Sequence, residues 1–281
     1  MRVHLLHRIR ALFHLPFLKK VTQSLHLRRF FRKIYFVLLG LRSVAYRKKK
    51  IALEGYEAVF QTANYHELMT VECSVLDGEI GGEREVLKHL LADLRPGDVA
   101  FDVGASLGIH TVFMALRVES RGMVVAFEPE KGSYQKLQAN VALNGLTNVL
   151  ALPVGLGEER RDISLYGGAE HCFNLRQKGR ELHQRAEIWP GDELIRKESL
   201  PRPGLVKIDV EGFEYFVLKG LEKTLRNPAC RSVCLEVHVH LLPSSVTPEM
   251  LLRFLEECGF VRADVLRYAA RPVYHEFYSK A

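Results

Sequence analysis

The first fifty residues of the chain contain no aspartate and no glutamate, although they hold 14 lysines and arginines. The whole chain has 281 residues and a formal charge of +7, from 40 basic and 33 acidic residues. The other 231 residues therefore hold 26 basic and 33 acidic side chains, a net charge of −7. A basic protein suggests nucleic-acid binding, but here the positive charge is confined to one end. We expect a basic N-terminal arm over residues 1–50 and an acidic domain over residues 51–281.

Cysteines and long apolar runs are also scarce. The five cysteines, at positions 73, 172, 230, 234 and 258, show neither the even number nor the regular spacing of a secreted disulfide framework. The longest apolar run, residues 34–41, is shorter than the roughly 18 residues that a membrane span requires. A signal peptide is a poor match, because this run begins late and no small-residue cleavage site is obvious. These absences favour a cytoplasmic protein.

The arm itself has amphipathic helical patterning. One helical face carries Leu5, Leu6, Ile9, Leu12 and Phe13. A second apolar face follows within residues 27–38, between arginines and lysines. Three interpretations stay open: two helices packed on the domain, a helix in peripheral contact with an anionic membrane, or an organelle transit peptide. The arm therefore predicts membrane association as one alternative among three.

From residue 51 onward, strands and helices alternate. After one or two strands within 51–70, the apolar runs predict strands at 99–103, 123–127, 148–154, 205–209, 232–239, 260–266 and 272–278. Helical spacing occurs at 83–94, 110–118, 132–143, 213–225 and 248–258. This alternation predicts an α/β fold with a doubly wound, mostly parallel sheet. An irregular stretch, 155–203, with a short strand at 162–166, is expected over the carboxyl ends of the strands, where ligands bind.

The most informative loop is Asp102–Gly108, which follows a buried strand and opens a helix. Gly104 and Gly108 permit a tight turn and a close backbone approach to a ligand. Glu128 ends the next strand, where a carboxylate can accept hydrogen bonds from both hydroxyls of a ribose. Ser106 stands where a dinucleotide fingerprint has glycine, so the pattern suits S-adenosylmethionine, which has no pyrophosphate. The rival interpretation is an ordinary strand-to-helix turn.

A second motif, Lys207–Glu214, ends the fourth strand of the domain. Strand alternation predicts that Asp209 and Glu211 share a face at the edge where doubly wound sheets place catalytic groups. Asp209 is the first candidate for a carboxylate beside the acceptor, and Glu211 is the second. Alternatively, both carboxylates serve only the N-terminus of the next helix.

The fifth strand adds two histidines to this edge. Alternation predicts one shared face for Cys234, Glu236, His238 and His240. His238 or His240 can act as a general base near neutral pH, unless both are merely partly buried. A divalent ion held by Asp209 and a fifth-strand group is a further alternative. A structural zinc site that includes Cys230 and Cys234 is disfavoured, because Cys230 precedes the strand. The preferred interpretation contains no metal.

Several of these segments together resemble the FkbM-type class I methyltransferases. The resemblance rests on Asp102–Gly108 with Thr111, Phe127-Glu128-Pro129, Asn144 and Lys207–Glu214, and it spans roughly residues 80–240. It implies a Rossmann-like, seven-stranded methyltransferase sheet whose last strand is antiparallel, with S-adenosylmethionine as the donor. It also implies a hydroxyl acceptor, often on a sugar of a glycan or natural product. The sequence departs at Ser106, where the family usually has asparagine.

These arguments assign two groups of site residues. The expected donor-binding residues are Asp102, Gly104, Ala105, Ser106, Gly108, Thr111, Glu128 and Asn144. The expected catalytic residues are Asp209, Glu211 and His238. His110 is a weaker donor-side candidate, and His171, Asn174 and Arg176 are weaker acceptor-side candidates.

The leading hypothesis is therefore an S-adenosylmethionine-dependent O-methyltransferase. An RNA methyltransferase guided by the basic arm is the alternative. Against it, the domain is acidic and no Asn-Pro-Pro-Tyr-like motif follows the fourth strand, so nucleic acid is not the expected partner. A non-catalytic scaffold that keeps the donor fold is a third hypothesis, which the intact Lys207–Glu214 motif disfavours.

Overall fold

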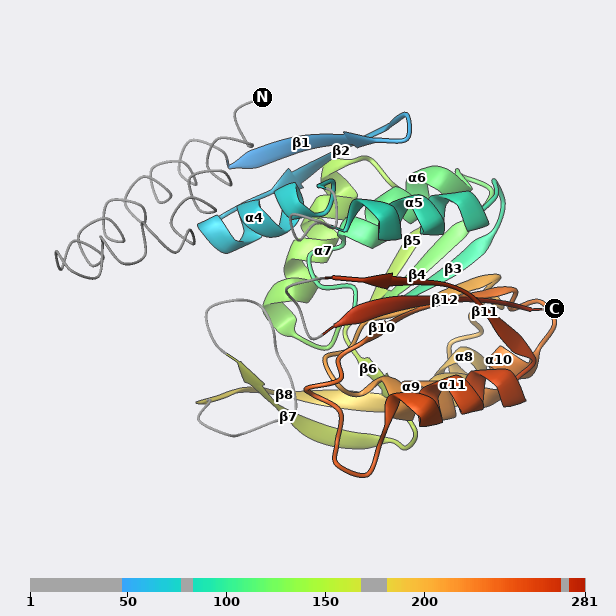
Figure 1. Ribbon diagram of the computed structural model, residues 1–281. Helices are drawn as coiled ribbons and strands as arrows, with labels where there is room; N and C mark the ends of the chain where they lie inside the picture. The colour runs from blue at the N-terminus through green and yellow to red at the C-terminus, as the bar shows by residue number, and fades with distance from the viewer. Residues whose placement is uncertain (1–46, 77–82, 168–180, 269–272, 281) are drawn as a thin grey trace, which may run out of the picture.

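The computed structural model describes residues 47–76, 83–167, 181–268 and 273–280. At its centre lies a seven-stranded sheet with the order β11-β12-β10-β9-β3-β4-β5 (Figure 1). Its strands are β3 (Val99–Val103), β4 (Met123–Phe127), β5 (Val149–Leu152), β9 (Leu205–Ile208), β10 (Ser232–Val237), β11 (Phe260–Arg267) and β12 (Tyr274–Lys280). The first five run parallel, and β12 lies antiparallel between β10 and β11. The predicted α/β, doubly wound, Rossmann-like sheet of seven strands is confirmed.

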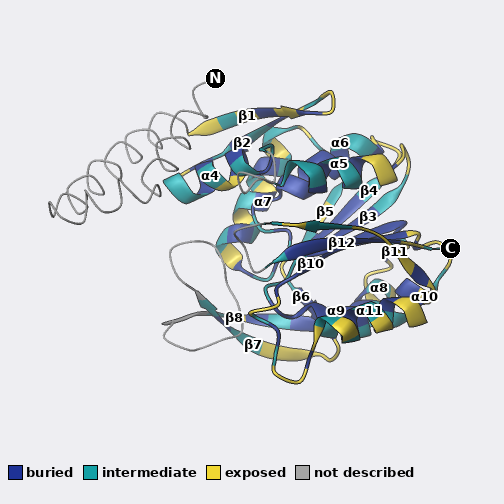
Figure 2. Cartoon of the chain, viewed as in Figure 1, coloured by how far each residue is buried: buried dark blue, intermediate teal, exposed yellow. Residues whose placement is uncertain are grey.

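Helices cover both faces of this sheet (Figure 1). One face carries α5 (Arg84–Asp93), α6 (Ile109–Val118) and α7 (Lys131–Leu143), and the other carries α8 (Gly191–Lys197), α9 (Glu214–Gly220), α10 (Glu222–Arg226) and α11 (Pro248–Glu257). Four of the parallel strands, β3, β4, β9 and β10, are almost wholly buried (Figure 2), as expected for a sheet covered on both faces, whereas the edge strand β5 is partly exposed.

A hairpin and a helix precede the sheet. Strands β1 (Lys48–Leu53) and β2 (Tyr56–Gln61) form an antiparallel pair, and α4 (Tyr65–Cys73) follows. The expected one or two strands within 51–70 are present as β1 and β2, and the end of that range is helical, because Asn64 caps α4 by accepting a hydrogen bond from the Glu67 amide. The expected arm over residues 1–50 lies outside the described residues up to residue 46, and its last three residues belong to β1.

The irregular stretch after β5 forms a small second sheet. Its strands β6 (Gly155–Gly157), β7 (Arg161–Gly167) and β8 (Glu181–Pro190) are ordered β6-β8-β7. The sequence predicted only one short strand in this stretch. Ile163, Leu165 and Ile188 from the second sheet line the cavity described below, so its position beside the ligand edge agrees with the expectation.

Candidate active site

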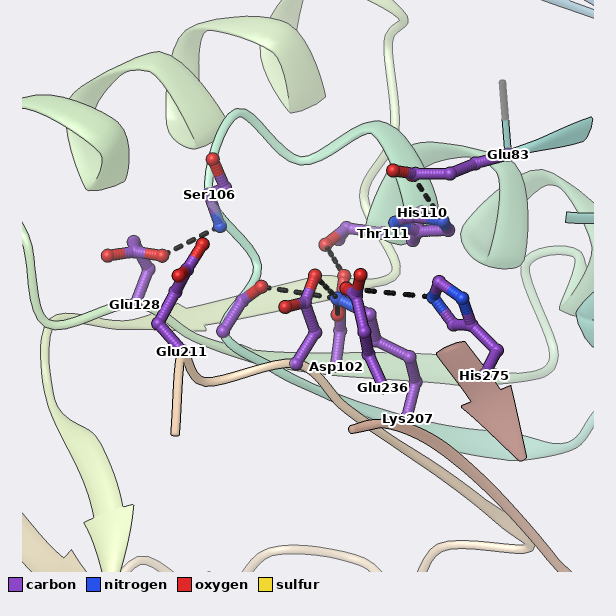
Figure 3. A network of polar contacts seen from close by, with 12 residues as sticks. Glu83, Asp102, Ser106, His110, Thr111, Glu128, Lys207, Glu211, Glu236 and His275 are labelled. Atoms are coloured by element: carbon purple, nitrogen blue, oxygen red, sulfur yellow. Dashed lines mark hydrogen bonds and ion pairs between the residues drawn. The ribbon is translucent and has the colours of Figure 1, made fainter. Parts of the chain in front are cut away.

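A cavity of about 320 Å³ opens at the carboxyl ends of β3, β4, β9 and β10. Its volume lies at the lower end of the range for small-molecule sites, roughly 300–1,000 Å³. Its lining includes the loop after β3 and Glu128, together with Asp209, Glu211, Glu236 and His238. Figure 3 shows Glu211 beside Glu128 and Ser106, and Glu236 beside Lys207. The structure thus brings the predicted donor loop and all three predicted catalytic residues to one cavity.

The loop after β3 has an unusual backbone. Gly104 and Gly108 have φ angles of 80° and 81°, and Ser106 has a φ of 50°. The amides of Gly104 and Ala105 both donate to the carbonyl of Phe127, at 3.0 and 3.1 Å, which holds the loop against β4. Gly104, Ala105 and Ser106 line the cavity. Gly108 instead packs below the loop, where an added Cβ would lie 2.5 Å from Leu137.

Glu128 lies directly beside this loop. One carboxylate oxygen accepts a hydrogen bond from the Ser106 amide at 2.7 Å (Figure 3). The other accepts from the Glu130 amide at 2.8 Å. Burial raises the pKa of Glu128 to about 7, and these two hydrogen bonds oppose the shift. The carboxylate is thus held in a fixed orientation at the cavity wall.

Asp102 and Thr111 lie one layer beneath the loop, outside the cavity lining. The Thr111 hydroxyl donates to Asp102 at 2.5 Å, and the Lys207 ammonium lies 3.2 Å from the other oxygen of the fully buried Asp102. Lys207 also lies 3.3 Å from Asp209 and donates to the Gly104 carbonyl at 3.2 Å. Burial alone would lower the pKa of Lys207, but Asp102 and Asp209 outweigh it and raise that pKa. These groups support the loop from below.

Asn144 is a correction to the predicted donor site. It ends α7, away from the residues that line the cavity. Its side chain accepts from the Val59 amide at 2.8 Å and donates to the Val59 carbonyl at 2.7 Å. Asn144 therefore anchors β2 to α7, and we withdraw it as a donor ligand.

The residues of the predicted acceptor side lie around His238. Its Nε2 atom lies 3.9 Å from carboxylate oxygens of Asp209, Glu211 and Glu236, and its Nδ1 atom lies 2.8 Å from Glu214. Burial lowers the pKa of His238, but Glu214, Asp209 and Glu211 outweigh this effect and raise it to about 9. An imidazole and several carboxylates thus meet at one point of the cavity wall.

Strand alternation, which the sequence suggested, does not account for the proximity of His238 to these carboxylates. Strand β9 ends at Ile208, and Asp209 and Glu211 lie in the turn that follows, with Glu211 at a φ of 54°. Strand β10 ends at Val237, so His238 and His240 lie beyond it rather than on its face. His238 still reaches the cavity, whereas His240 is not among the residues that line it.

Sequence reasoning gave no role to three buried neighbours: Glu214, Lys207 and His275. The first two stand inside the Lys207–Glu214 motif, which was a usable signal. His275 lies on β12 opposite Glu236, with its Nε2 atom 3.6 Å from that carboxylate (Figure 3). Burial lowers the pKa of His275 to about 3. The weaker candidate His110 lines the cavity 3.9 Å from Glu83, and His171, Asn174 and Arg176 lie outside the described residues.

Within the described part of the chain, one group of side chains has the proximity needed for a metal ion: Asp209, Glu236 and His238. Cys230 and Cys234 do not join it. Burial raises the pKa of the Cys230 thiol to about 12 and that of Cys234 further. The group therefore consists of two carboxylates and one imidazole, without a cysteine.

Comparisons with known proteins cover most of the chain. A family model described as the methyltransferase FkbM domain matches residues 102–262. A hexuronic acid methyltransferase, AglP, of Haloferax volcanii is 29% identical over 210 residues, which cover 74% of this chain and 82% of that protein. The 31-O-demethyl-FK506 methyltransferase FkbM of Streptomyces tacrolimicus is 31% identical over 201 residues, which cover 59% of this chain and 75% of that protein. A solved S-adenosylmethionine-dependent O-methyltransferase of Thermotoga maritima is 14% identical, with a TM-score of 0.47. The match covers 83% of this chain and 77% of that one.

Proposed function

Because the chain belongs to the FkbM methyltransferase family and is an S-adenosylmethionine-dependent methyltransferase, we propose that it methylates a hydroxyl group of a sugar or similar natural-product acceptor. The relatives support this acceptor class, since one is named for a hexuronic acid and the other for a 31-O-demethyl compound. The observation that carries the proposal is that one cavity is lined by the glycine loop, by Glu128 and by the Asp209–Glu211–His238 group.

The donor side fits S-adenosylmethionine. Gly104, Ala105 and Ser106 expose backbone to the cavity, and Glu128 offers a carboxylate for the ribose hydroxyls. Asp102 and Thr111 hold the loop in place from beneath it. When bound, S-adenosylmethionine supplies a methyl group on a positively charged sulfur. The surplus of carboxylates around the cavity favours such a cationic ligand.

The acceptor side must position the hydroxyl and take its proton. Asp209, Glu211 and His238 are the groups that we assign to this task. Glu214 bonds to Nδ1 of His238 and so leaves Nε2 directed at the carboxylates. Asp209 and Glu211 are each about a quarter exposed, so a proton that reaches them can leave to solvent.

A labelled-methyl assay tests the acceptor class directly. Purified full-length protein is given labelled S-adenosylmethionine and a panel of uronic acid glycosides, neutral glycosides and RNA. We expect label in an alkali-stable ether on a glycoside. Label in RNA alone would contradict the proposal.

Variants of the three acceptor-side residues then test their roles. Asp209→Asn, Glu211→Gln and His238→Gln should each lower kcat by about 100-fold, with donor binding, measured by calorimetry, kept within about threefold. Glu256→Gln on the exposed face of α11 is the matched control. Full activity in all three site variants would refute their assignment.

The basic arm leads to a proposal about location. We propose that the arm over residues 1–50 contacts an anionic membrane peripherally through its part before Arg47, supported by the ten basic residues of that part and the apolar helical pattern of Leu5 to Phe13. Among the helices that the structure describes, none is long and apolar enough to cross a bilayer. A truncation before Arg47 keeps β1 intact. Vesicles with 30% phosphatidylserine should bind the full chain and not the truncated one, and equal binding of both chains would refute the proposal.

A further inference from the structure

Three side chains from two neighbouring strand ends converge beside the donor cavity. Asp209 follows β9, Glu236 lies near the end of β10, and His238 lies one residue beyond β10. One oxygen or nitrogen atom from each lies within 4.8 Å of the others, and Nε2 of His238 is 3.9 Å from both carboxylates. Ligands at right angles around an ion at about 2.1 Å lie about 3 Å apart. Side-chain movements of roughly 1 Å therefore bring these three atoms onto one cation.

The imidazole of His238 is oriented by a residue outside this group. Its Nδ1 atom lies 2.8 Å from Oε1 of Glu214, whose side chain is fully buried, and the Gly212 amide donates to the same oxygen at 2.9 Å. Because that carboxylate only accepts, Nδ1 carries a proton, and Nε2, which faces Asp209 and Glu236, offers its lone pair to a cation once the cation has displaced the Nε2 proton. Metal-binding histidines characteristically have such a carboxylate on the second ring nitrogen.

The carboxylates around Nε2 of His238 favour the binding of a cation. Asp209 and Glu236 are adjacent carboxylates, and Glu211 places a third carboxylate oxygen 3.9 Å from Nε2 of His238. The nearest lysine, Lys207, is shared between Asp209 and Asp102. A fourth carboxylate, that of Glu214, is hydrogen-bonded to Nδ1 of His238. Protonated His238 and Lys207 balance these carboxylates in part, and a divalent ion that displaces the Nε2 proton would neutralise them in its place.

We propose that Asp209, Glu236 and His238 bind one divalent cation, and that the acceptor hydroxyl completes its coordination. Two carboxylates and one imidazole form a mixed donor set that suits a first-row ion such as Mn²⁺ better than Mg²⁺, which prefers oxygen alone. Three protein ligands leave positions open for the hydroxyl. This inference rests on the proposed function, because it names the device that prepares the acceptor.

The cation changes the roles of His238 and Glu211 at the site. As a Lewis acid it lowers the pKa of the hydroxyl that contacts it. The proton passes to Glu211, which the cation does not occupy and which reaches solvent. The hydroxyl oxygen then forms a bond to the methyl carbon while the carbon–sulfur bond breaks and its electron pair stays on sulfur. The products are a methyl ether, a neutral thioether and one proton, so His238 acts as a ligand and Glu211 as the base.

Metal binding can be measured without catalysis. Chelator-treated full-length protein is titrated with Mn²⁺ by calorimetry and by electron paramagnetic resonance. We expect one bound ion per chain. Asp209→Asn, Glu236→Gln and His238→Gln should each weaken binding at least 30-fold, and Glu214→Gln about 10- to 100-fold.

Glu211→Gln serves as the matched control for this titration. It removes a neighbouring carboxylate that is not a ligand, so it should change Mn²⁺ affinity less than threefold while it lowers methyl transfer. Thermal unfolding and donor binding show whether each variant is folded. Absence of Mn²⁺ binding to the folded wild type, or unchanged binding by the three ligand variants, would overturn the site.

The outcomes separate this inference from the proposed function. Methyl transfer to a glycoside at full rate in metal-free protein would refute the cation and leave the function standing. One tightly bound Mn²⁺ that depends on the three ligands, with no transfer to any hydroxyl acceptor, would support the cation and refute the function.

Discussion

A Cβ atom added to Gly104 would lie 1.8 Å from the carbonyl oxygen of Asp209. The donor loop after β3 and the acceptor-side turn after β9 are therefore in backbone contact. Asp209 also donates its amide to the Val103 carbonyl at 3.0 Å. The two halves of the cavity are thus held against each other by the main chain, and a change at Gly104 must disturb both.

Gly104→Ala should therefore destabilise the protein and abolish donor binding. Alanine at a φ of 80° is strained, and its Cβ must push the turn at Asp209 away. We expect a loss of about 3 kcal/mol or more in the free energy of unfolding, measured by urea denaturation. Gly145→Ala is the matched control: it also has a positive φ, 65°, but no atom within 4 Å of its Cβ. It should lose only about 1 kcal/mol, and an equal loss in both variants would contradict the contact argument.

Asn144→Ala should lower stability without changing donor affinity. The variant leaves both backbone groups of Val59 without their side-chain partner, which should cost about 2 kcal/mol. Asn140→Ala makes an informative contrast, because its side chain joins the Gln61 amide to the Leu107 carbonyl of the donor loop. We expect calorimetry to show weaker S-adenosylmethionine binding in Asn140→Ala alone. A donor-binding defect in Asn144→Ala would restore that residue to the donor site.

The role of Asn144 shows a limit of sequence reasoning. A motif located the residue after a helix, but its partner β2 lies more than 80 positions earlier in the chain. His275, near the C-terminus, shows the same limit. Strand β12 inserts antiparallel beside β10 and so places His275 next to Glu236, and no local pattern specifies that register.

Local patterns succeeded where the chemistry is itself local. The strand, glycine loop and helix around Asp102–Gly108 occur as predicted. The shared location of Asp209 and Glu211 was also anticipated, but for the wrong reason. A positive φ at Glu211 and Gly212 turns the chain immediately after β9, and such a turn brings both carboxylates to the cavity without any strand alternation.

The pH dependence of stability should change when Glu128 is replaced. Its pKa is raised to about 7 in the folded protein, from an ordinary value of 4.5. Between these values the folded state holds more protons than the unfolded state, so stability from this group is complete below pH 4.5 and is lost as the pH rises through 7. Relative to Glu128→Gln, the wild type should therefore lose about 3 kcal/mol between pH 4.5 and pH 7.5. Parallel unfolding curves across this range check the difference, and a constant offset between the two proteins would contradict the raised pKa.

Lys207 should be coupled energetically to Asp102 beneath the loop. Its side chain is 2% exposed and lies between two carboxylates, so Lys207→Met leaves Asp102 buried with an unpaired charge. We expect a loss of about 3–5 kcal/mol in unfolding free energy.

A double-mutant cycle separates the charge from the packing. Asp102→Asn removes the charge but keeps an oxygen for the Thr111 hydroxyl. The double variant should therefore be less destabilised than the sum of the two single variants, with a coupling energy of about 1–3 kcal/mol. Lys223→Met, on the exposed side of α10, should change stability by less than about 0.5 kcal/mol. Additive effects of the Lys207 and Asp102 substitutions would show that the ion pair does not hold the donor loop, and the lysine would then act on the site only through Asp209.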